Sequence, residues 1–206
     1  PDIFKDYILS DYSINCLRRI SKGLETASGH RAWRITGGYG TGKSSFALFL
    51  AHWLSGRADD YSTDSGKRID YATFTDNPPR FVPVLVTGSR APLGPAIVEG
   101  IRTCLLSSGS NGKTNTLMKK LENVLQSNEN ARDDQIVELV MEANHYAIRS
   151  GRGNGLVVII DELGKFLEFS ALYPEKQDVY LLQRLAEAAE ARRAEAIPAD
   201  CFATLA

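Results

Sequence analysis

Residues 37–44 read Gly-Gly-Tyr-Gly-Thr-Gly-Lys-Ser and match the pattern G-x-x-x-x-G-K-[ST] in full. A short strand-like segment, 32–36, precedes this stretch and an apolar segment, 44–54, follows it, which is the order of strand, loop and helix that the pattern requires. Glycines let such a loop curl so that its N–H groups point inward at a phosphate, and the helix N-terminus adds partial positive charge. The stretch therefore predicts a site for a nucleoside triphosphate.

The chemistry of that loop assigns roles to its residues. Lys43 would reach the β- and γ-phosphates, which makes it a candidate catalytic residue, and the Ser44 hydroxyl would occupy one position around Mg²⁺. The predicted nucleotide-binding residues are Gly37, Gly38, Tyr39, Gly40, Thr41, Gly42, Lys43, Ser44 and Ser45. Two alternatives are a glycine-rich turn that only caps a helix and a dinucleotide-binding loop, which fits less well because it needs G-x-G-x-x-G.

A second motif, residues 156–162, is an apolar stretch that ends in two carboxylates, Leu-Val-Val-Ile-Ile-Asp-Glu. Because ligands bind at the carboxyl edge of parallel sheets, we expect Asp161 to hold Mg²⁺, usually through its water, and Glu162 to polarise the attacking water. Another strand-like stretch follows at 201–205. The order of loop, strand, acidic strand and further strand is typical of P-loop ATPases with a catalytic glutamate. A small-molecule kinase fits less well because it transfers phosphate to a bound acceptor.

Apolar periodicity divides the chain into alternating strands and helices. Strands are expected at 32–36, 81–86, 156–160 and 201–205. Helices are expected at 13–24, 44–54, 92–106, 116–126, 133–149 and 177–196. The helix at 44–54 is apolar on nearly every side, which predicts that it is buried, and the continuous apolar run at 81–86 predicts a strand inside a covered sheet. Strands that alternate with helices indicate an α/β fold with a parallel sheet.

These elements suggest one core with additions. Residues 1–30 form an expected helical lead-in, and 31–206 form the nucleotide-binding core, with a polar insertion at about 55–80 and a helical insertion at about 107–150. The chain begins at Pro1 without a methionine and stops inside a strand-like segment. We therefore expect the domain to be incomplete at its C-terminus.

Composition limits the partners and the compartment. The 206 residues carry 24 Lys and Arg against 25 Asp and Glu, a net charge of −1, so nucleic acid remains a possible partner that the charge does not support. Cys16, Cys104 and Cys201 are far apart, which indicates free thiols in a reducing compartment. The longest apolar run is too short to span a bilayer. We expect a cytoplasmic protein with no membrane partner.

Two stretches carry a resemblance to a known group of proteins. Residues 31–47, Arg-Ala-Trp-Arg-Ile-Thr-Gly-Gly-Tyr-Gly-Thr-Gly-Lys-Ser-Ser-Phe-Ala, and 157–168, Val-Val-Ile-Ile-Asp-Glu-Leu-Gly-Lys-Phe-Leu-Glu, resemble the AAA+/STAND group of P-loop ATPases. More narrowly, they are similar to the ATPase modules of large bacterial proteins linked to phage defence and DNA restriction. The two motifs cover roughly residues 31–54 and 155–190, and the middle of the chain contributes little.

The resemblance implies a three-layer P-loop NTPase fold of the additional-strand, catalytic-glutamate type. In this fold the fourth strand lies between the strand before the loop and the acidic strand, and it carries a polar sensor residue near its end, for which Thr204 is the only polar candidate. An arginine finger and a helical lid would lie beyond residue 206. Tyr7 and Ile8 would flank the adenine. Arg34 departs from the pattern, because an apolar residue is usual there, and we expect it to face outward at the lower edge of the sheet.

The function expected from these observations is the binding of ATP and Mg²⁺ and the hydrolysis of ATP. The domain would be the motor or switch of a larger bacterial anti-phage defence or restriction protein, with other domains or subunits as partners and a homo-oligomer, usually a ring, implied by the resemblance. One alternative is a nucleotide-gated oligomerisation switch with little turnover, and another is a DNA-stimulated motor or loader. Lys165 and Glu168 could couple nucleotide state to a partner, and Arg192 and Arg193 could contact a neighbour's phosphate. Solvated helix faces are the alternative for both pairs.

Overall fold

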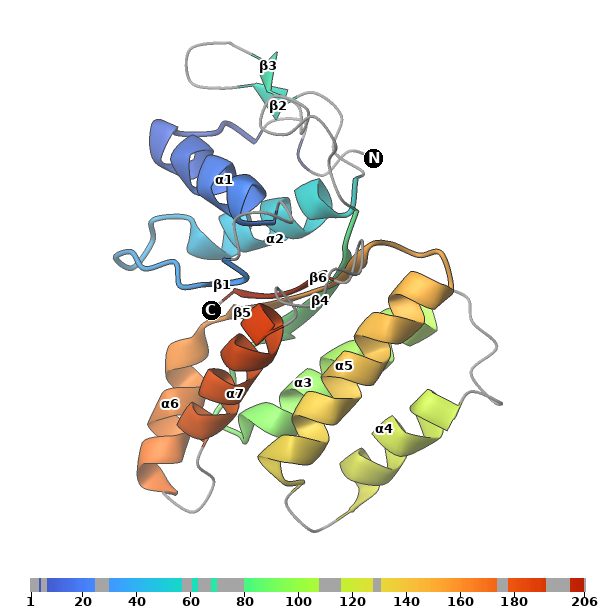
Figure 1. Ribbon diagram of the computed structural model, residues 1–206. Coiled ribbons are helices and arrows are strands. Elements are labelled where there is room, and N and C mark those ends of the chain that lie inside the picture. Colours follow the sequence, from blue (N-terminus) through green and yellow to red (C-terminus); the bar gives the residue numbers. More distant parts are fainter. Residues whose placement is uncertain are drawn as a thin grey trace.

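The computed structural model describes residues 4, 7–24, 30–56, 61–62, 68–69, 80–107, 116–127, 131–173, 178–191 and 201–205. These residues form a mixed α/β structure of seven helices and six strands (Figure 1). The helices are α1 (Asp11–Leu24), α2 (Lys43–Leu54), α3 (Leu93–Ser107), α4 (Thr116–Gln126), α5 (Asp133–Arg149), α6 (Leu163–Leu172) and α7 (Asp178–Ala191). The strands are β1 (Ala32–Trp33), β2 (Tyr61–Ser62), β3 (Arg68–Ile69), β4 (Val82–Thr87), β5 (Gly155–Asp161) and β6 (Cys201–Leu205).

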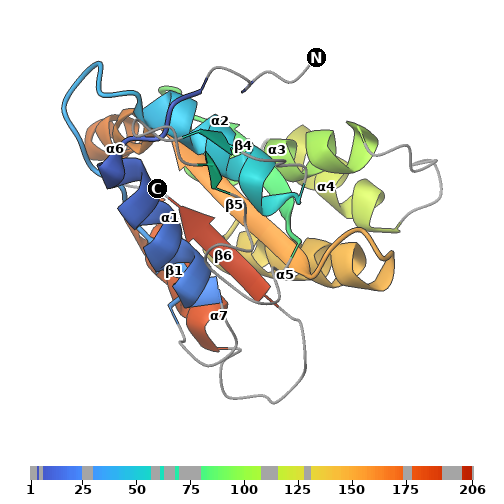
Figure 2. The ribbon, with the colours of Figure 1, turned by 90° about the horizontal axis from the view of Figure 1, so that it is seen from above.

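Four of the strands form a parallel sheet in the order β1-β6-β5-β4. Figure 2 shows β6 beside β5 in the middle of this sheet. The last strand in sequence therefore lies between the strand before the glycine-rich loop and the acidic strand, which confirms the expected strand order. Because all four strands run the same way, their carboxyl ends meet at one edge of the sheet, where parallel sheets bind ligands.

Side chains of the central strand β5 enter two separate cores, because successive residues of a strand point to opposite faces. Leu156, Val158 and Ile160 pack in one core with α3, α5 and α7, and Val157 and Ile159 pack in the other with α1 and α2. Figure 1 shows α1 and α2 on one side of the sheet and α3, α5 and α7 on the other. Helices thus cover both faces of β5, whose side chains before Asp161 are all buried.

Helix α2 follows the glycine-rich loop directly and anchors it to the sheet. Phe46, Phe49, Leu50 and Trp53 are buried against α1 and β5. The prediction of a helix buried on every side is wrong, however, because the side chain of Leu48 is 51% exposed. Apolar composition does not reveal which face of a helix meets the core.

Strand β4 corrects a second expectation. It forms an edge of the sheet, and its side chains alternate between buried and exposed: Val82, Val84 and Val86 enter the core, whereas Leu85 and Thr87 are exposed. The second face of β4 is therefore only partly covered: α2 contacts the strand, but Leu85 and Thr87 remain exposed. A continuous apolar run was wrongly interpreted as a strand covered on both faces.

Of the remaining boundaries, β1 is shorter than the expected 32–36, and the end of the helix expected at 177–196 lies outside the described residues. Helices α4 and α5 span the expected residues, and β6 forms the expected fourth strand. The range of helix α6 was not predicted, although a solvated helix was the alternative given for Lys165 and Glu168. The antiparallel pair β2–β3 lies inside the expected polar insertion, most of which is outside the described residues. Arg192 and Arg193 also lie outside the described residues. None of the helices described here is long and apolar enough to cross a membrane.

Candidate functional site

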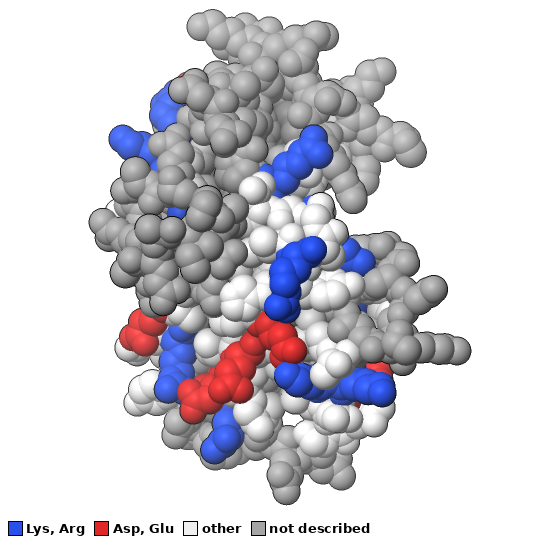
Figure 3. Space-filling view, turned by 45° about the vertical axis from the view of Figure 1, so that its right-hand side comes forward, with Lys and Arg blue, Asp and Glu red and all other residues white. Residues whose placement is uncertain are grey.

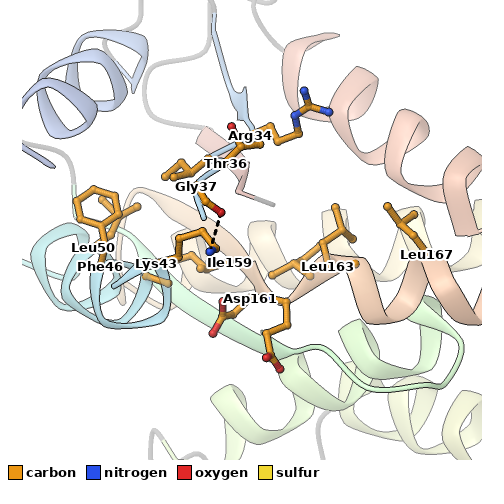
Figure 4. Close-up of a pocket in the computed structure, with 15 residues that line it drawn as sticks. Arg34, Thr36, Gly37, Lys43, Phe46, Leu50, Ile159, Asp161, Leu163 and Leu167 are labelled. Atoms are coloured by element: carbon orange, nitrogen blue, oxygen red, sulfur yellow. Dashed lines mark hydrogen bonds between the residues drawn. The ribbon is translucent and has the colours of Figure 1, made fainter. Parts of the chain in front are cut away.

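The glycine-rich loop joins β1 to α2 and closes around a lysine ammonium. Lys43 Nζ donates to the carbonyl oxygens of Gly37 at 2.9 Å and Gly38 at 2.7 Å, and Figure 4 shows the first of these bonds. Gly40 and Gly42 have φ values of 75° and 81°, in the left-handed region that favours glycine, and a β-carbon at either position would have no neighbour within 4 Å. The loop is thus an open cradle with a cation at its base.

The acidic strand ends beside the end of its neighbour. Asp161, the last residue of β5, pairs in register with Thr87 of β4, and its carbonyl accepts a hydrogen bond of 2.8 Å from the Gly88 N–H. Asp161 Oδ1 also accepts a bond of 3.0 Å from the N–H of Glu162. Hydrogen bonds from the residue after β4 and the residue after β5 therefore hold the main chain at Asp161.

Glu162 has an unusual backbone conformation. Its φ of 54° and ψ of 40° are left-handed, and no other residue except glycine among those described has a positive φ. Two bonds to Lys165 accompany this conformation: the Lys165 N–H donates to the Glu162 carbonyl at 3.0 Å, and Lys165 Nζ donates to Glu162 Oε2 at 2.5 Å. Strained conformations of this kind persist at functional sites when surrounding contacts hold them.

Residues of both motifs line one cavity of about 310 Å³. Gly37 and Lys43 come from the loop and Asp161 and Glu162 from the end of β5, and residues 34–36 with apolar side chains of α2, β5 and α6 complete the lining. Figure 4 shows Asp161 below Lys43, whose ammonium points to Gly37. The structure therefore brings together the predicted phosphate-binding lysine, the predicted metal-binding aspartate and the predicted catalytic glutamate.

A second cavity, of about 640 Å³, lies against the same loop. It is lined by Tyr7 and Ile8 of the lead-in, by residues of α1, and by Thr41, Gly42 and Lys43 of the loop. Tyr7 stacks on Phe49 with ring centroids 4.9 Å apart, and burial raises the pKa of its hydroxyl. Lys43 lines both cavities, so a ligand that occupied both would pass beside its ammonium.

Some predicted residues lie outside these cavities. Ser45 lines the second cavity, but Ser44 is exposed and lines neither, and Tyr39 projects fully into solvent. No group of three or more His, Cys, Asp or Glu side chains that could hold a metal lies among the described residues. A Ser44 hydroxyl and an Asp161 carboxylate are nevertheless oxygen donors of the kind that suit Mg²⁺, which usually keeps several waters and phosphate oxygens and needs only one or two protein ligands.

The structure places two residues of the sheet differently from expectation. Arg34 is exposed and faces outward as expected, but it lies between β1 and the loop, at the carboxyl edge rather than the lower edge, where it lines the first cavity and points away from Lys43 (Figure 4). Thr204 pairs with Val158, three residues before Asp161, so its backbone lies about 10 Å short of that edge at 3.3 Å per residue.

Sequence reasoning missed two features of the site. Gly88, directly after β4, bonds to Asp161, and Leu163 and Leu167 of α6 line the first cavity. A glycine directly after a predicted strand is a turn signal that could have drawn attention to Gly88. Nothing in the local pattern shows that residues 163–167 would face the cavity.

The surface carries charges of both signs. Figure 3 shows one face of the molecule, on which Asp and Glu side chains lie among Lys and Arg side chains. Among the described residues, Lys120 and Glu142 form an ion pair of 2.8 Å between α4 and α5. The described part of the face in Figure 3 is therefore unlike the uniformly basic surfaces that bind nucleic acid.

Comparison with known protein families, with curated proteins and with solved structures finds no match to this chain. Conclusions about its function therefore rest on its own motifs and on the geometry of the two cavities. The strongest observation is that the loop lysine and the acidic pair line the same cavity.

Proposed function

We propose that this chain is a P-loop ATPase domain of the AAA+/STAND kind, which binds ATP with Mg²⁺ and hydrolyses it to ADP and phosphate. One observation carries the proposal: Gly37 and Lys43 of a complete G-x-x-x-x-G-K-[ST] loop line one cavity with Asp161 and Glu162. A glycine-rich turn that only capped a helix would not need an acidic pair across a cavity from its lysine.

The sheet supports the finer fold assignment. Helices on both faces of a parallel sheet, with β6 between β1 and β5, match the three-layer P-loop NTPase fold of the additional-strand, catalytic-glutamate type. In that arrangement the loop after β1 and the acidic end of β5 are separated by one strand. The space between them accommodates the phosphates of a nucleotide.

Roles within the site follow from charge and position. Lys43 neutralises the β- and γ-phosphates, and their oxygens replace the Gly37 and Gly38 carbonyls that its ammonium contacts now. Ser44 and Asp161 would hold Mg²⁺, which neutralises the charge that develops on the phosphates. Glu162 orients and polarises the attacking water.

The second cavity suits the rest of the nucleotide. It lies next to the loop and is walled by Tyr7 and Ile8, so a base could pack there against apolar and aromatic surface while the phosphates extend past Lys43. This arrangement agrees with the adenine contact that the resemblance implies for these two residues. The nucleotide would then span both cavities.

The wider setting of the domain rests on the sequence resemblance alone. We propose that hydrolysis drives or switches attached parts of a larger bacterial defence or restriction protein in the cytoplasm, and that the domain works as an oligomer. The charges of both signs on the surface do not favour direct binding to DNA.

The test is phosphate release by the wild-type chain and by Glu162→Gln, with Glu168→Gln as the matched control on α6. We expect Glu162→Gln to bind ATP normally but to release phosphate at least ~100-fold more slowly, because it lacks the general base. Glu168, whose side chain is 62% exposed and pairs with Arg90, should tolerate the same change. Undiminished release by Glu162→Gln would remove its catalytic role, and tight binding with no release by the wild type would favour the oligomerisation switch.

A further inference from the structure

Gly88 lies against the backbone of Glu162. A β-carbon placed on Gly88 would come within 2.1 Å of the Glu162 carbonyl oxygen, 2.8 Å of its carbonyl carbon and 2.9 Å of its β-carbon. Real β-carbons essentially never approach other atoms this closely. Any side chain at position 88 therefore requires the backbone at Glu162 to move.

The two segments cannot simply separate to make room. The Gly88 N–H donates to the Asp161 carbonyl at 2.8 Å, and the preceding residues of β4 and β5 pair in register up to Thr87 and Asp161. A side chain at position 88 would thus press on Glu162, which directly follows Asp161, a residue held in the sheet by these bonds. The residue that has to yield is Glu162, which already holds a left-handed conformation.

We infer that Gly88 is a positioning residue for Glu162: the missing side chain at the end of β4 allows the left-handed turn that brings the Glu162 carboxylate to the cavity. Glu162 follows Asp161 directly, so its backbone angles decide in which direction its side chain leaves the sheet edge. With Gly88 in place Glu162 lines the same cavity as Lys43. This inference rests on the proposed function, because it concerns the orientation of the proposed general base.

The experiment compares Gly88→Ala with Gly94→Ala, a control glycine in α3 that lines neither cavity. A β-carbon at Gly94 would have side-chain atoms of Ile136, at 3.2 Å and 3.4 Å, as its nearest neighbours, and alanine favours the helix. We expect Gly88→Ala to slow phosphate release at least ~10-fold, because a displacement of about 1 Å can cost on the order of 100-fold in rate. Its affinity for ATP should stay within about 2-fold of the wild type, and Gly94→Ala should change neither quantity.

A double variant separates positioning from a general structural effect. If Gly88 acts through Glu162, adding Gly88→Ala to Glu162→Gln should leave the residual rate of Glu162→Gln unchanged, because the effects of substitutions at interacting residues do not add. A further loss of rate in the double variant, or a loss of ATP affinity equal to the loss of rate, would overturn the inference.

The outcomes distinguish this inference from the proposed function. If Glu162→Gln releases phosphate at the wild-type rate, the proposed role of Glu162 fails. If Glu162→Gln is slow and Gly88→Ala is not, only the inference about Gly88 fails.

If Gly88→Ala does not fold, a second variant combines it with Glu162→Gly, since glycine adopts other backbone angles freely. Folding should then be regained, and continued unfolding would contradict the inference.

Discussion

The ammonium of Lys165 donates to Oε2 of Glu162 at 2.5 Å, across one turn at the start of α6. The two side chains are 47% and 46% exposed, and exposed ion pairs contribute only about 0–1 kcal/mol to folding. The pair therefore matters more for the direction of the Glu162 carboxylate than for stability. It occupies one carboxylate oxygen and leaves Oε1 for another partner.

Replacing Lys165 with methionine should release the Glu162 side chain into several rotamers. We expect Lys165→Met to slow phosphate release about 3- to 10-fold, with little change in ATP affinity or melting temperature, because only the alignment of a general base is lost. Lys165→Arg keeps the cation and should restore most of the rate. Faster release by Lys165→Met would show instead that the pair holds Glu162 away from the water.

Ile8 offers a test of the base-binding cavity, since it lines that cavity and its side chain is 61% exposed. Ile8→Ala should lower the affinity for ATP about 3- to 10-fold, because a buried contact with the base is lost. Binding of inorganic tripolyphosphate, which has no base, should not change. Leu48→Ala removes another exposed apolar side chain, one that lines neither cavity, and serves as control. Equal losses for ATP and tripolyphosphate would place the base elsewhere.

Asn144 fixes the start of β5 from helix α5. Its side chain is fully buried, and Oδ1 accepts a hydrogen bond of 2.8 Å from the Leu156 N–H. Asn144→Ala leaves that buried N–H without an acceptor, so the free energy of unfolding should fall by about 1–3 kcal/mol. Asn123→Ala on the exposed face of α4 is the control, and denaturant titration measures both. A loss no larger than that of the control would mean that water replaces the bond.

Glu99 supplies a pH test. Its hydrogen bond with Arg102, helped by their charges, lowers the pKa of the Glu99 carboxyl below the ordinary value of 4.5. A lowered folded-state pKa stabilises the fold above the ordinary value, and this contribution is lost as the pH falls through the folded-state pKa. Glu99→Gln should therefore be slightly less stable than the wild type at pH 7, and the difference should vanish in acid. A difference that persists in acid would point to packing instead.

The sequence predicted the parts of the site that are encoded locally. The glycine-rich loop and the Asp161–Glu162 pair are contiguous motifs, and the parallel order of the strands was enough to predict that they meet at one edge. The helices α4 and α5 were predicted correctly because their apolar residues recur at helical spacing. Whether the site binds ATP remains a prediction.

The features that were missed depend on contacts between distant segments. Gly88 matters only because the backbone of Glu162 lies against it, and the exposure of Leu48 depends on where the other helices stop. Thr204 was the only polar candidate near the end of the fourth strand, but the register with Val158 puts its backbone below the sheet edge. Periodicity and composition carry no information about register or about which segments meet.

Binding of ATP in the presence of Mg²⁺, measured by titration calorimetry, tests the central claim most directly. The wild-type chain and the control Lys119→Ala, an exposed position on α4, should bind ATP equally well. Lys43→Ala should bind at least ~10-fold more weakly, because it removes the charge that lies at the base of the loop. Equal affinity of Lys43→Ala and the wild type, or no binding by the wild type, would contradict the assignment of this loop as a phosphate site.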